Sequence, residues 1–449
     1  MTDVPPGWAK TTLGEIADTS LGKMLDRGKA TGEHAVPYLR NVNVQWGRVD
    51  LDDVLTMDII PDERDFFWLE PGDLLVCEGG EIGRCAIWSG QSERMAYQKA
   101  LHRVRPRRGV DAKYLRYLME HMSLAGLLAP YSTGSTIKHL PQQQLRRISL
   151  YLPPSAEQRR IVSTLEGYLS HLDAAYAGVA RVAQRLKSLT RRVLIEAVPV
   201  PGPEQWKLLS VADAGQVELG RARHPNWHTG PHMRPYLRVA NVFEDRIDVS
   251  DLMEMDFPPN LFERYRLAEM DILLNEGQSP EYLGRPAIYR GVPKEVAFTN
   301  TLLRFRAGPD VLPEWALLVF RRHMHSGRFI REVRITTNIA HLSAERLKRV
   351  EFPVPPLGEQ EQIITDVQEK LDAVQRFIGA VEKGTKRAHA LRKSLLAEAF
   401  AGRLAVQDSA DEPASLLLER LRAERAAQGP TRRTRRGKGD MASQKEALL

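Results

Sequence analysis

Two stretches of the chain carry apolar residues at alternating steps of four and three positions. In the first stretch these residues are Ile161, Leu165, Tyr168, Leu172, Ala175, Val179, Val182, Leu186, Leu189 and Val193. In the second they are Ile364, Val367, Leu371, Val374, Ile378 and Val381, after which the pattern weakens at Thr385 and Ala388 and resumes at Leu391 and Leu395. A 3.5-residue period held over several heptads predicts long helices of the coiled-coil type.

The apolar seams of these two helices need a partner. If the helices pair with each other, both seams are covered within one chain. Alternatively, each helix could lie separately against its own globular domain. Mutual pairing about an internal pseudo-two-fold axis would make the helices antiparallel. A helix of about 40 residues would then be about 60 Å long and hold one domain at each end.

A Pro-Pro motif precedes each predicted helix. LPPSAEQRRIV covers residues 152–162, and VPPLGEQEQII covers residues 354–364, an offset of 202. Prolines followed by a Ser or Gly and an early glutamate are typical of a helix start. The return of this motif after nearly half the chain indicates an internal repeat.

The repeat extends over most of the chain. PYLRNVNV (37–44) returns as PYLRVANV (235–242), GDLLVCEGG (72–80) as MDILLNEGQ (270–278), GRCAIW (83–88) as GRPAIY (284–289), and TIKHL (136–140) as NIAHL (338–342). The offset grows from 198 to 201 between Gly277 and Gly284, and to 202 before Asn338. The second copy therefore contains two small insertions, and the chain is predicted to hold two copies of one domain.

Each copy begins with a mixed part. Short apolar runs at 73–77, 85–88, 102–106 and 147–152 predict strands, and patterns at 111–128 and 312–325 predict one helix per copy. We therefore predict an α+β fold with an antiparallel coiled coil. Its segments are recognition domains at 1–151 and 201–353, helical spacers at 152–200 and 354–404, and a tail at 405–449.

The tail differs in composition from the repeat. DEPASLLLERLRAERAA (411–427) predicts a capped amphipathic helix, and TRRTRRGKGD (431–440) predicts a basic disordered run. The helix could be a docking element or a frayed extension. The basic run could add non-specific affinity for DNA.

Composition narrows the functional classes. The 449 residues carry a net charge of +7 and an isoelectric point near 9.3, which favours polyanions such as nucleic acid. No signal-peptide pattern and no apolar run of membrane-spanning length are present in the sequence. Cys77 and Cys85 are replaced by Asn275 and Pro286 in the second copy, which favours a packing role in a reducing compartment.

In their order and duplication, these motifs resemble those of type I restriction–modification specificity subunits. The matching features are W-x-x-x-x-L from Trp8 to Leu13, with Trp206 in the second copy, and the segments PYLRNVNV, GDLLVCEGGEIGR, STGSTIKHL and LPPSAEQRRIV. The resemblance covers residues 8 to about 404. It implies a non-catalytic DNA-binding subunit in which each mixed domain reads one half of a split DNA target.

The same resemblance implies the partners. Double-stranded DNA would be the ligand, in the cytoplasm of a prokaryotic cell and associated with the nucleoid. Two modification (methyltransferase) subunits would dock on the spacer helices, and restriction (translocase–nuclease) subunits would join them. No cofactor is expected on this chain, whereas the partners would use S-adenosylmethionine, ATP and Mg. The helical residues implied in spacing and docking are Ile161, Leu165, Leu172, Val179, Leu186, Ile364, Val367, Leu371, Val374 and Ile378.

Loops that differ between the copies are the better candidates for reading bases, because domains that read different half-sites share a scaffold. The three such loops follow LGK (21–23) and LGR (219–221), separate the two strands at 79–83 and 277–284, and precede the Pro-Pro motifs at 132–140 and 334–342. Basic, hydroxyl and amide side chains suit phosphates and base edges. The candidate DNA-binding residues in these loops are Lys23, Arg27, Lys29, Ser135, Thr136, Lys138, Arg221, Arg223, Gln278, Ser279, Thr336, Thr337 and Asn338.

Four further candidates are shared by the copies and have two interpretations. Arg40 and Arg238, with Asn43 and Asn241, could position phosphates in both domains. Alternatively, the arginines could form salt bridges at strand ends and the asparagines could stabilise turns.

Three histidines in the second copy are candidates for a metal site. His224, His228 and His232 recur every four residues, but Pro225 and Gly230 interrupt any continuous helix. A solvated or DNA-facing loop is therefore favoured over a metal site.

The chain lacks the motifs of an enzyme that cuts or methylates DNA. It has no G-x-x-x-x-G-K-[ST] loop. LPPS and VPPL lack the polar residue and the aromatic ring of an adenine methyltransferase motif, and the repeated Asp73 and Asp271 have no shared lysine at a fitting spacing. These absences favour a binding subunit whose partners catalyse. The alternatives are a coiled-coil scaffold that joins proteins, and a specificity-like subunit of another phage-defence system.

Overall fold

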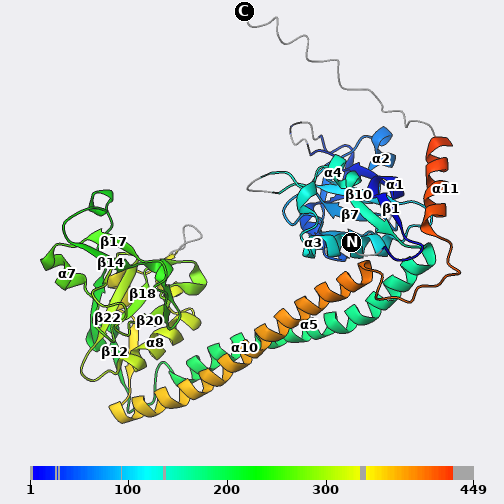
Figure 1. Cartoon of the computed structure of the whole chain (residues 1–449). Helices are drawn as coiled ribbons and strands as arrows, with labels where there is room; N and C mark the ends of the chain where they lie inside the picture. Colours follow the sequence, from blue (N-terminus) through cyan, green and yellow to red (C-terminus); the bar gives the residue numbers. More distant parts are fainter. Residues whose placement is uncertain are drawn as a thin grey trace, which may run out of the picture. The chain divides into compact units, whose positions relative to one another are not determined.

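The structure is a computed structural model that describes residues 4–25, 28, 31–92, 94–134, 138–333 and 340–427. It divides into two compact units. Unit 1 comprises residues 1–176 and 385–449, and unit 2 comprises residues 177–384. Each unit contains one mixed domain and a segment of both long helices, α5 (Ser155–Ala197) and α10 (Leu357–Phe400) (Figure 1).

The mixed domain of unit 1 consists of short strands and helices. Its strands are β1 (Ala9–Thr12), β2 (Ala17–Leu21), β3 (Ala35–Leu39), β4 (Val44–Gln45), β5 (Arg48–Val49), β6 (Leu55–Asp58), β7 (Leu74–Cys77), β8 (Cys85–Ile87), β9 (Ala96–Tyr97), β10 (Leu101–Pro106) and β11 (Ser149–Leu152). Its helices are α1 (Leu13–Ile16), η1 (Asn41–Asn43), α2 (Pro61–Phe67), α3 (Ala112–Leu124), η2 (Ala129–Tyr131) and α4 (Gln142–Arg147). The strands predicted at 73–77, 85–88, 102–106 and 147–152 are thus β7, β8, β10 and β11.

Unit 2 repeats this order. Its strands are β12 (Lys207–Ser210), β13 (Gly215–Leu219), β14 (Met233–Leu237), β15 (Val242–Phe243), β16 (Arg246–Ile247), β17 (Met253–Asp256), β18 (Ile272–Asn275), β19 (Gly277–Gln278), β20 (Pro286–Ile288), β21 (Ala297–Phe298), β22 (Leu302–Ala307), β23 (Ala340–His341) and β24 (Glu351–Val354). Its helices are α6 (Val211–Ala214), η3 (Pro225–Trp227), η4 (Val239–Asn241), α7 (Pro259–Tyr265), η5 (Pro280–Tyr282), α8 (Pro313–His325), η6 (Phe329–Glu332) and α9 (Ala344–Lys348).

The sheets of the two units have the same topology. A four-stranded sheet has the order β2-β10-β7-β8 in unit 1 and β13-β22-β18-β20 in unit 2. A three-stranded sheet has the order β6-β3-β9 in one and β17-β14-β21 in the other, and β1 pairs with β11 as β12 pairs with β24. The internal repeat is therefore confirmed at the level of strand pairing.

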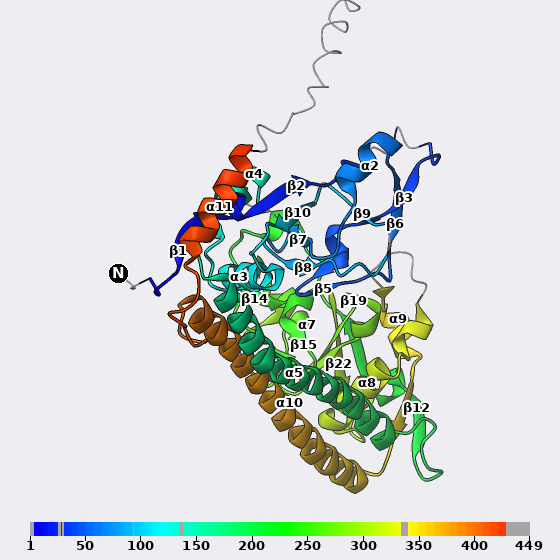
Figure 2. The ribbon, with the colours of Figure 1, turned by 90° about the vertical axis from the view of Figure 1, so that its right-hand side faces the viewer.

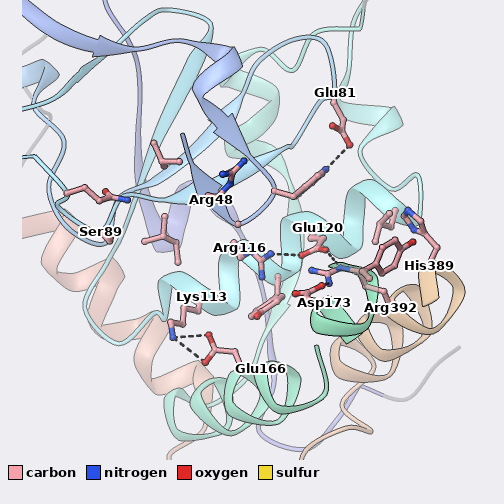
Figure 3. A pocket seen from close by; sticks show the side chains of 18 residues that line it. Arg48, Glu81, Ser89, Lys113, Arg116, Glu120, Glu166, Asp173, His389 and Arg392 are labelled. Atoms are coloured by element: carbon pink, nitrogen blue, oxygen red, sulfur yellow. Dashed lines mark hydrogen bonds and ion pairs between the residues drawn. The ribbon is translucent and has the colours of Figure 1, made fainter. Parts of the chain in front are cut away.

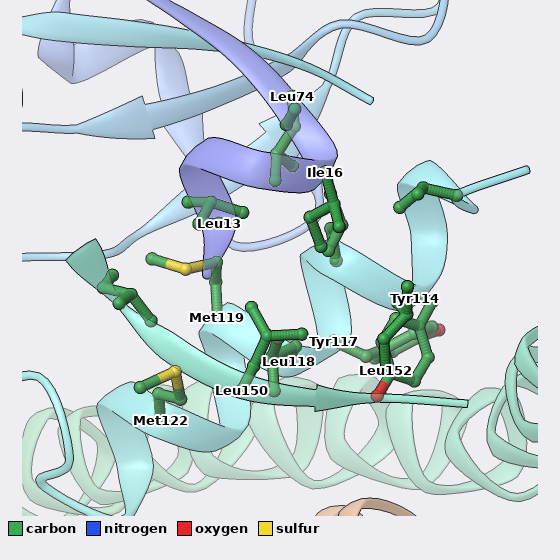
Figure 4. Packing of buried hydrophobic residues seen from close by; sticks show 14 of the residues in the cluster. Leu13, Ile16, Leu74, Tyr114, Tyr117, Leu118, Met119, Met122, Leu150 and Leu152 are labelled. Atoms are coloured by element: carbon green, nitrogen blue, oxygen red, sulfur yellow. The ribbon is translucent and has the colours of Figure 1, made fainter. Parts of the chain in front are cut away.

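The core of each mixed domain lies between the four-stranded sheet and one helix. In unit 1 the helix is α3, and Figure 4 shows its Tyr114, Leu118 and Met119 among the buried residues that also include Leu13 and Leu150. Asp111 caps α3 by accepting hydrogen bonds from the backbone N–H groups of the first turn. In unit 2 an aromatic cluster around Phe305 and Phe352 packs under α8.

The repeated Leu-Gly dipeptide has a steric explanation. A Cβ at Gly22 would lie 2.2 Å from the carbonyl oxygen of Tyr97, and a Cβ at Gly220 would lie 2.2 Å from that of Thr299. Two backbone segments thus approach too closely for any side chain. This contact joins the edge of the four-stranded sheet to the three-stranded sheet in both units.

The repeated Glu-Gln of the Pro-Pro motifs attaches each long helix to its domain. The Gln158 side chain accepts a hydrogen bond from the Asp111 N–H (2.9 Å) and donates to the Pro153 carbonyl (3.0 Å). Gln360 repeats both contacts in unit 2, and both glutamine side chains are fully buried. The motif recurs because each helix needs the same buried attachment.

The long helices pack against each other in antiparallel fashion within each unit. In unit 1 the start of α5, at Leu165 and Leu169, shares a cluster with the end of α10, at Leu396 and Ala399. In unit 2 the end of α5, at Leu194, shares a cluster with the start of α10, at Val367 and Leu371. The predicted coiled coil is confirmed (Figure 1).

The predicted seam of α5 was wrong at four of its ten positions, where Ala175 and three larger side chains are exposed. Tyr168, Val182 and Leu189 are 43–56% exposed, whereas Leu169 is 2% exposed. Of the other six, Ile161, Leu165 and Leu186 are buried as predicted, and Leu172, Val179 and Val193 are half-buried. Because each helix also packs on a mixed domain, its contact stripe is rotated by one residue from the seam that periodicity alone indicated.

The tail helix α11 (Ala414–Ala427) docks on unit 1. Its Leu417, Leu418 and Leu421 are buried in the core cluster of that unit, and the Ala414 N–H donates to the Gly7 carbonyl. A Cβ at Gly109 would lie 2.8 Å from Leu417, so a glycine is needed under the helix. The tail helix is therefore packed on unit 1 and not frayed, and a role as a docking element for partners stays a prediction. The basic run at 431–440 lies outside the described residues. No described helix is long and apolar enough to cross a membrane.

Candidate nucleic-acid interface

Two of the loops predicted to read DNA come together in unit 1. The turn after β7 pairs with the segment before α4 through a bridge between Gly79 and His139, and the Leu140 N–H donates to the Glu78 carbonyl (2.7 Å). The Asn41 side chain of η1 donates to the Gly79 carbonyl (2.9 Å). Residues 41–43, 78–83, 133–134 and 138–140 therefore form one loop cluster.

Unit 2 builds the same loop cluster with more regular structure. Strand β19 pairs with β23, with Gly277 opposite His341, and the Leu342 N–H donates to the Glu276 carbonyl (2.7 Å). The turn that holds the three inserted residues follows this pairing and contains η5. The cluster thus has a shared backbone frame in both units and different side chains, as expected of a surface that reads different sequences.

The first divergent loop is fastened to the three-stranded sheet. In unit 1 the Asp58 carboxylate accepts from the backbone N–H groups of Thr31 (2.6 Å) and Gly32 (2.8 Å), and these bonds lower the pKa of Asp58, the Gly32 bond most. In unit 2 Asp256 accepts from the His232 N–H (2.7 Å). The loop has the same attachment in both copies, although its sequence differs.

Several predicted DNA-binding residues are exposed on the described surface. Lys138 and Arg223 are exposed, and no described residue pairs with either side chain. Gln278 and Ser279 are half-buried at the start of the inserted turn. Lys23 forms an ion pair with Glu63 of α2 and lies over the Phe67 ring, so its charge is partly used within unit 1.

The four shared candidates have structural roles. Asn43 and Asn241 are 2% and 3% exposed, and each donates to two carbonyl groups of its own loop. Arg40 pairs with Asp53 (2.6 Å), and Arg238 pairs with Asp251 in the equivalent position. The second interpretation applies: both pairs hold the η-turn after the strand, and we remove them from the DNA-binding set.

Arg221 was also misassigned. Its guanidinium lies 4.2 Å from the Trp227 ring centroid and 4.9 Å from that of Phe257, and the residue is 7% exposed. It donates a hydrogen bond to the Asp256 carbonyl. A cation enclosed by two rings supports the loop rather than contacting a ligand.

Seven of the predicted DNA-binding residues lie outside the described residues: Arg27, Lys29, Ser135, Thr136, Thr336, Thr337 and Asn338.

Among the residues that the structure describes, no group of three or more His, Cys, Asp or Glu side chains could hold a metal ion. Cys77 and Cys85 are fully buried, and burial raises the pKa of both thiols, to about 11 for Cys77. Their predicted packing role is confirmed.

A charged cluster joins the mixed domain of unit 1 to its helices, beside a cleft of about 950 Å³ (Figure 3). Arg392 of α10 donates to Glu120 of α3 (2.5 Å) and to Asp173 of α5 (2.7 Å). Glu120 also pairs with Arg116 (3.0 Å) and is 4% exposed. One arginine thus links three helices.

The equivalent position of unit 2 carries the opposite charge, and its ion pairs lie within the mixed domain. Arg321 stands on α8 where α3 carries Glu120, and it pairs with Glu244 (2.8 Å), which also contacts His325 (2.9 Å). Burial opposes ionisation of Glu244, but His325 and Arg321 outweigh it and hold the pKa of this carboxyl at about 2. Among the described residues, the ion pairs at this position reach the long helices in unit 1 only.

The sequence reasoning missed these junction residues. Position 392 continues the heptad spacing from Thr385 and Ala388, whereas the predicted Leu391 is 52% exposed. An arginine at a heptad position, where an apolar residue is expected, was the feature of the sequence that could have indicated this ion pair. His139 and His341 were also overlooked as members of the loop clusters, although both copies share them.

The chain is similar to proteins of one family. A sequence model of the type I restriction modification DNA specificity domain matches residues 5–175. The chain is 22% identical to the EcoKI type I restriction enzyme specificity subunit of Escherichia coli K12, over 96% of this chain and 98% of that protein. It is 21% identical to the StySPI specificity subunit of Salmonella potsdam, over the same shares of the two chains.

A solved structure has the same fold. It comes from a study of complex assembly and conformational transition of the type I restriction–modification system. It superposes with a TM-score of 0.69 at 17% identity, covering 89% of this chain and 99% of that one. The internal repeat, the sheet topology and the paired helices agree with these similarities, and over nearly its whole length the chain is similar to type I restriction–modification specificity subunits.

Proposed function

We propose that this chain reads a bipartite DNA sequence, with one half-site contacted by each mixed domain. The observation that carries the proposal is the pair of loop clusters, at 78–83 with 133–134 and 138–140, and at 276–284 with 340–342. Each cluster has the same backbone hydrogen bonds and different side chains. The paired helices α5 and α10 would set the number of unread base pairs between the half-sites.

The partners follow from that role. Two modification subunits would dock on the paired helices and supply S-adenosylmethionine chemistry, and restriction subunits would add ATP- and Mg-dependent cleavage. The chain itself would contribute binding and positioning at the nucleoid. The name of the EcoKI relative describes a specificity subunit of a type I restriction enzyme, which supports such an assembly.

A single-molecule methylation map of the host genome, with and without the gene, tests the proposal. We expect one split motif, methylated on adenine in both halves, to disappear with the gene. A map that stays unchanged while the partner subunits are expressed, together with no sequence preference in a DNA selection on the purified chain, would support a protein-joining scaffold.

Lys138 is expected to contact a phosphate. Replacing it with alanine should weaken binding to all duplexes nearly uniformly and lower the slope of log K against log salt by about one. The slope is measured by fluorescence anisotropy across a salt series. Lys10, an exposed lysine of β1, provides the control, and Lys10→Ala should leave the slope unchanged. An unchanged slope for Lys138→Ala would remove this residue from the interface.

The helices are expected to act as a ruler. Inserting one heptad after Ala177 in α5 and one after Gly384 in α10 keeps both seams in register. Seven residues add about 10 Å at 1.5 Å per residue, which is about three base pairs at 3.4 Å each. The methylated motif should keep both half-sites and gain about three unread base pairs. A motif with its original spacing would contradict the proposal that the length of the helices sets the distance between the half-sites.

A further inference from the structure

A basic cleft of about 930 Å³ lies in unit 1, apart from the loop cluster and from the charged junction. Residues of β2, β10, α4 and the end of α11 line it, together with Phe66 of α2. Figure 2 shows where these elements lie in unit 1. Four arginines line it: Arg103, Arg107, Arg146 and Arg425. Among the described lining residues the only carboxylate is Asp18, which is already paired with Arg107 (2.7 Å).

The same place in unit 2 carries its own anion. Arg304 of β22 lies opposite Glu218 of β13, and its Nη2 donates to the Glu218 carboxylate (2.5 Å). Glu218 also accepts from Arg264 (2.6 Å). Both cations of unit 2 therefore pair with the same carboxylate.

Unit 1 keeps the arginine and lacks the carboxylate. Arg103 lies opposite Ser20 in the equivalent strand register. Its Nη1 donates to the Phe66 and Trp68 carbonyls (3.0 and 3.1 Å), as Arg304 Nη1 does to those of Arg264 and Arg266. No described residue accepts from Arg103 Nη2, and its Nε is buried without a partner.

The surrounding residues fit this difference. Tyr97 stands at the position of Phe298, and its hydroxyl lies 2.5 Å from that of Ser20. Arg146 and Arg425 are exposed at the cleft, and no described carboxylate pairs with either. Phe66 is 56% exposed, and its ring lies 6.0 Å from the Arg103 guanidinium.

We propose that this cleft binds the phosphate of a nucleotide unit, which takes the place that Glu218 occupies in unit 2. Arginine forks match phosphate oxygens, and an exposed aromatic ring offers a surface on which a base can stack. The nucleotide could be free or part of a DNA strand, since both present the same group. The tail helix has a role here, because it supplies Arg425 to unit 1 only.

A double variant transplants the arrangement of unit 2. Ser20→Glu with Tyr97→Phe should place a carboxylate beside Arg103. This carboxylate would then fill the position that we assign to the phosphate of the ligand. Isothermal titration of the full chain with pyrophosphate and with deoxyadenosine monophosphate, at constant ionic strength, should show affinity at least about tenfold weaker than in the wild type. Arg146→Ala, at an exposed position, should weaken both ligands without affecting folding. Arg420→Ala, on α11 but outside the cleft, should have no effect.

Binding of a duplex that lacks the recognition sequence shows whether the phosphate comes from a free nucleotide or from a DNA strand. If the double variant also loses affinity for the duplex, the cleft holds a DNA strand, and if only the small ligands are affected, it holds a free nucleotide. Absence of saturable pyrophosphate binding, or equal binding by wild type, the double variant and Arg146→Ala, overturns the proposal. Phosphate binding in the cleft does not require the chain to recognise a DNA sequence. Pyrophosphate binding by a chain without sequence preference would instead contradict the proposed function.

Discussion

Replacing Arg392 with methionine should destabilise unit 1 by about 3 kcal/mol. The substitution leaves Glu120, which is 4% exposed, with Arg116 as its remaining cation, and it removes the link from α10 to Asp173. Breaking a buried ion pair from one side costs about 3–5 kcal/mol, and the surviving Arg116 places this case at the lower end. Without this link, α3 and the end of α10 should open locally more often.

Hydrogen exchange of the full chain, followed by mass spectrometry, measures that opening locally. The double variant Arg392→Met with Glu120→Gln should recover part of the loss, because no unpaired charge then remains. The control is Arg420→Met, which breaks an ion pair whose side chains are 54% and 51% exposed. Such a pair contributes at most about 1 kcal/mol. Equal effects of the two arginine substitutions would show that the junction is not a buried network.

Acidification should destabilise unit 1 through His102. The residue is fully buried, its Nε2 donates to the Leu140 carbonyl (2.7 Å), and its Nδ1 has no partner among the described residues. Burial lowers the pKa of His102 to about 4, from 6.5 in the unfolded chain. The stabilisation is complete above pH 6.5 and is lost as the pH falls towards 4, because only the unfolded chain takes up the proton. The loss amounts to about 2 kcal/mol between pH 7 and pH 5.

His102→Leu tests this loss, since leucine stands at the equivalent position 303 of β22. The variant should lose about 1 kcal/mol at all pH values through the unpaired Leu140 carbonyl. It should lack the loss of stability on acidification that His102 causes. The stability difference between variant and wild type should therefore shift by about 2 kcal/mol in favour of the variant from pH 7 to pH 5. His171→Leu, on an exposed stretch of α5, provides the baseline, and a pH-independent difference for His102→Leu would refute the assignment.

Burial acts in the same direction in unit 2. His323 is fully buried, donates to the Glu351 carbonyl and has a lowered pKa because of burial and the neighbouring Arg322. Both mixed domains thus contain a histidine that stays neutral when folded, on different elements. This coincidence was not visible in the repeat, because His102 and His323 are not at matching positions.

Much of the fold could be predicted because the signals are local. The strands β7, β8, β10 and β11 and the helices α3 and α8 follow from short patterns of apolar residues and turn residues. The repeat was visible because equivalent loops and strands need the same backbone contacts, such as the close approach at Gly22 and Gly220. The DNA-binding set was less predictable, because a side chain in a loop can equally support the loop, as Arg221 and Asn43 do.

The sequence by itself determined that the chain holds two copies of one domain, each followed by a long helix with a heptad seam. These properties depend on neighbours in the sequence and on self-similarity. Only the tertiary structure decided which stripe of α5 is buried, that Arg392 rather than Leu391 occupies the seam of α10, and that Arg103 lacks the carboxylate that Arg304 has. Those outcomes depend on strands and helices far apart in the sequence, whose side chains meet only when the chain has folded.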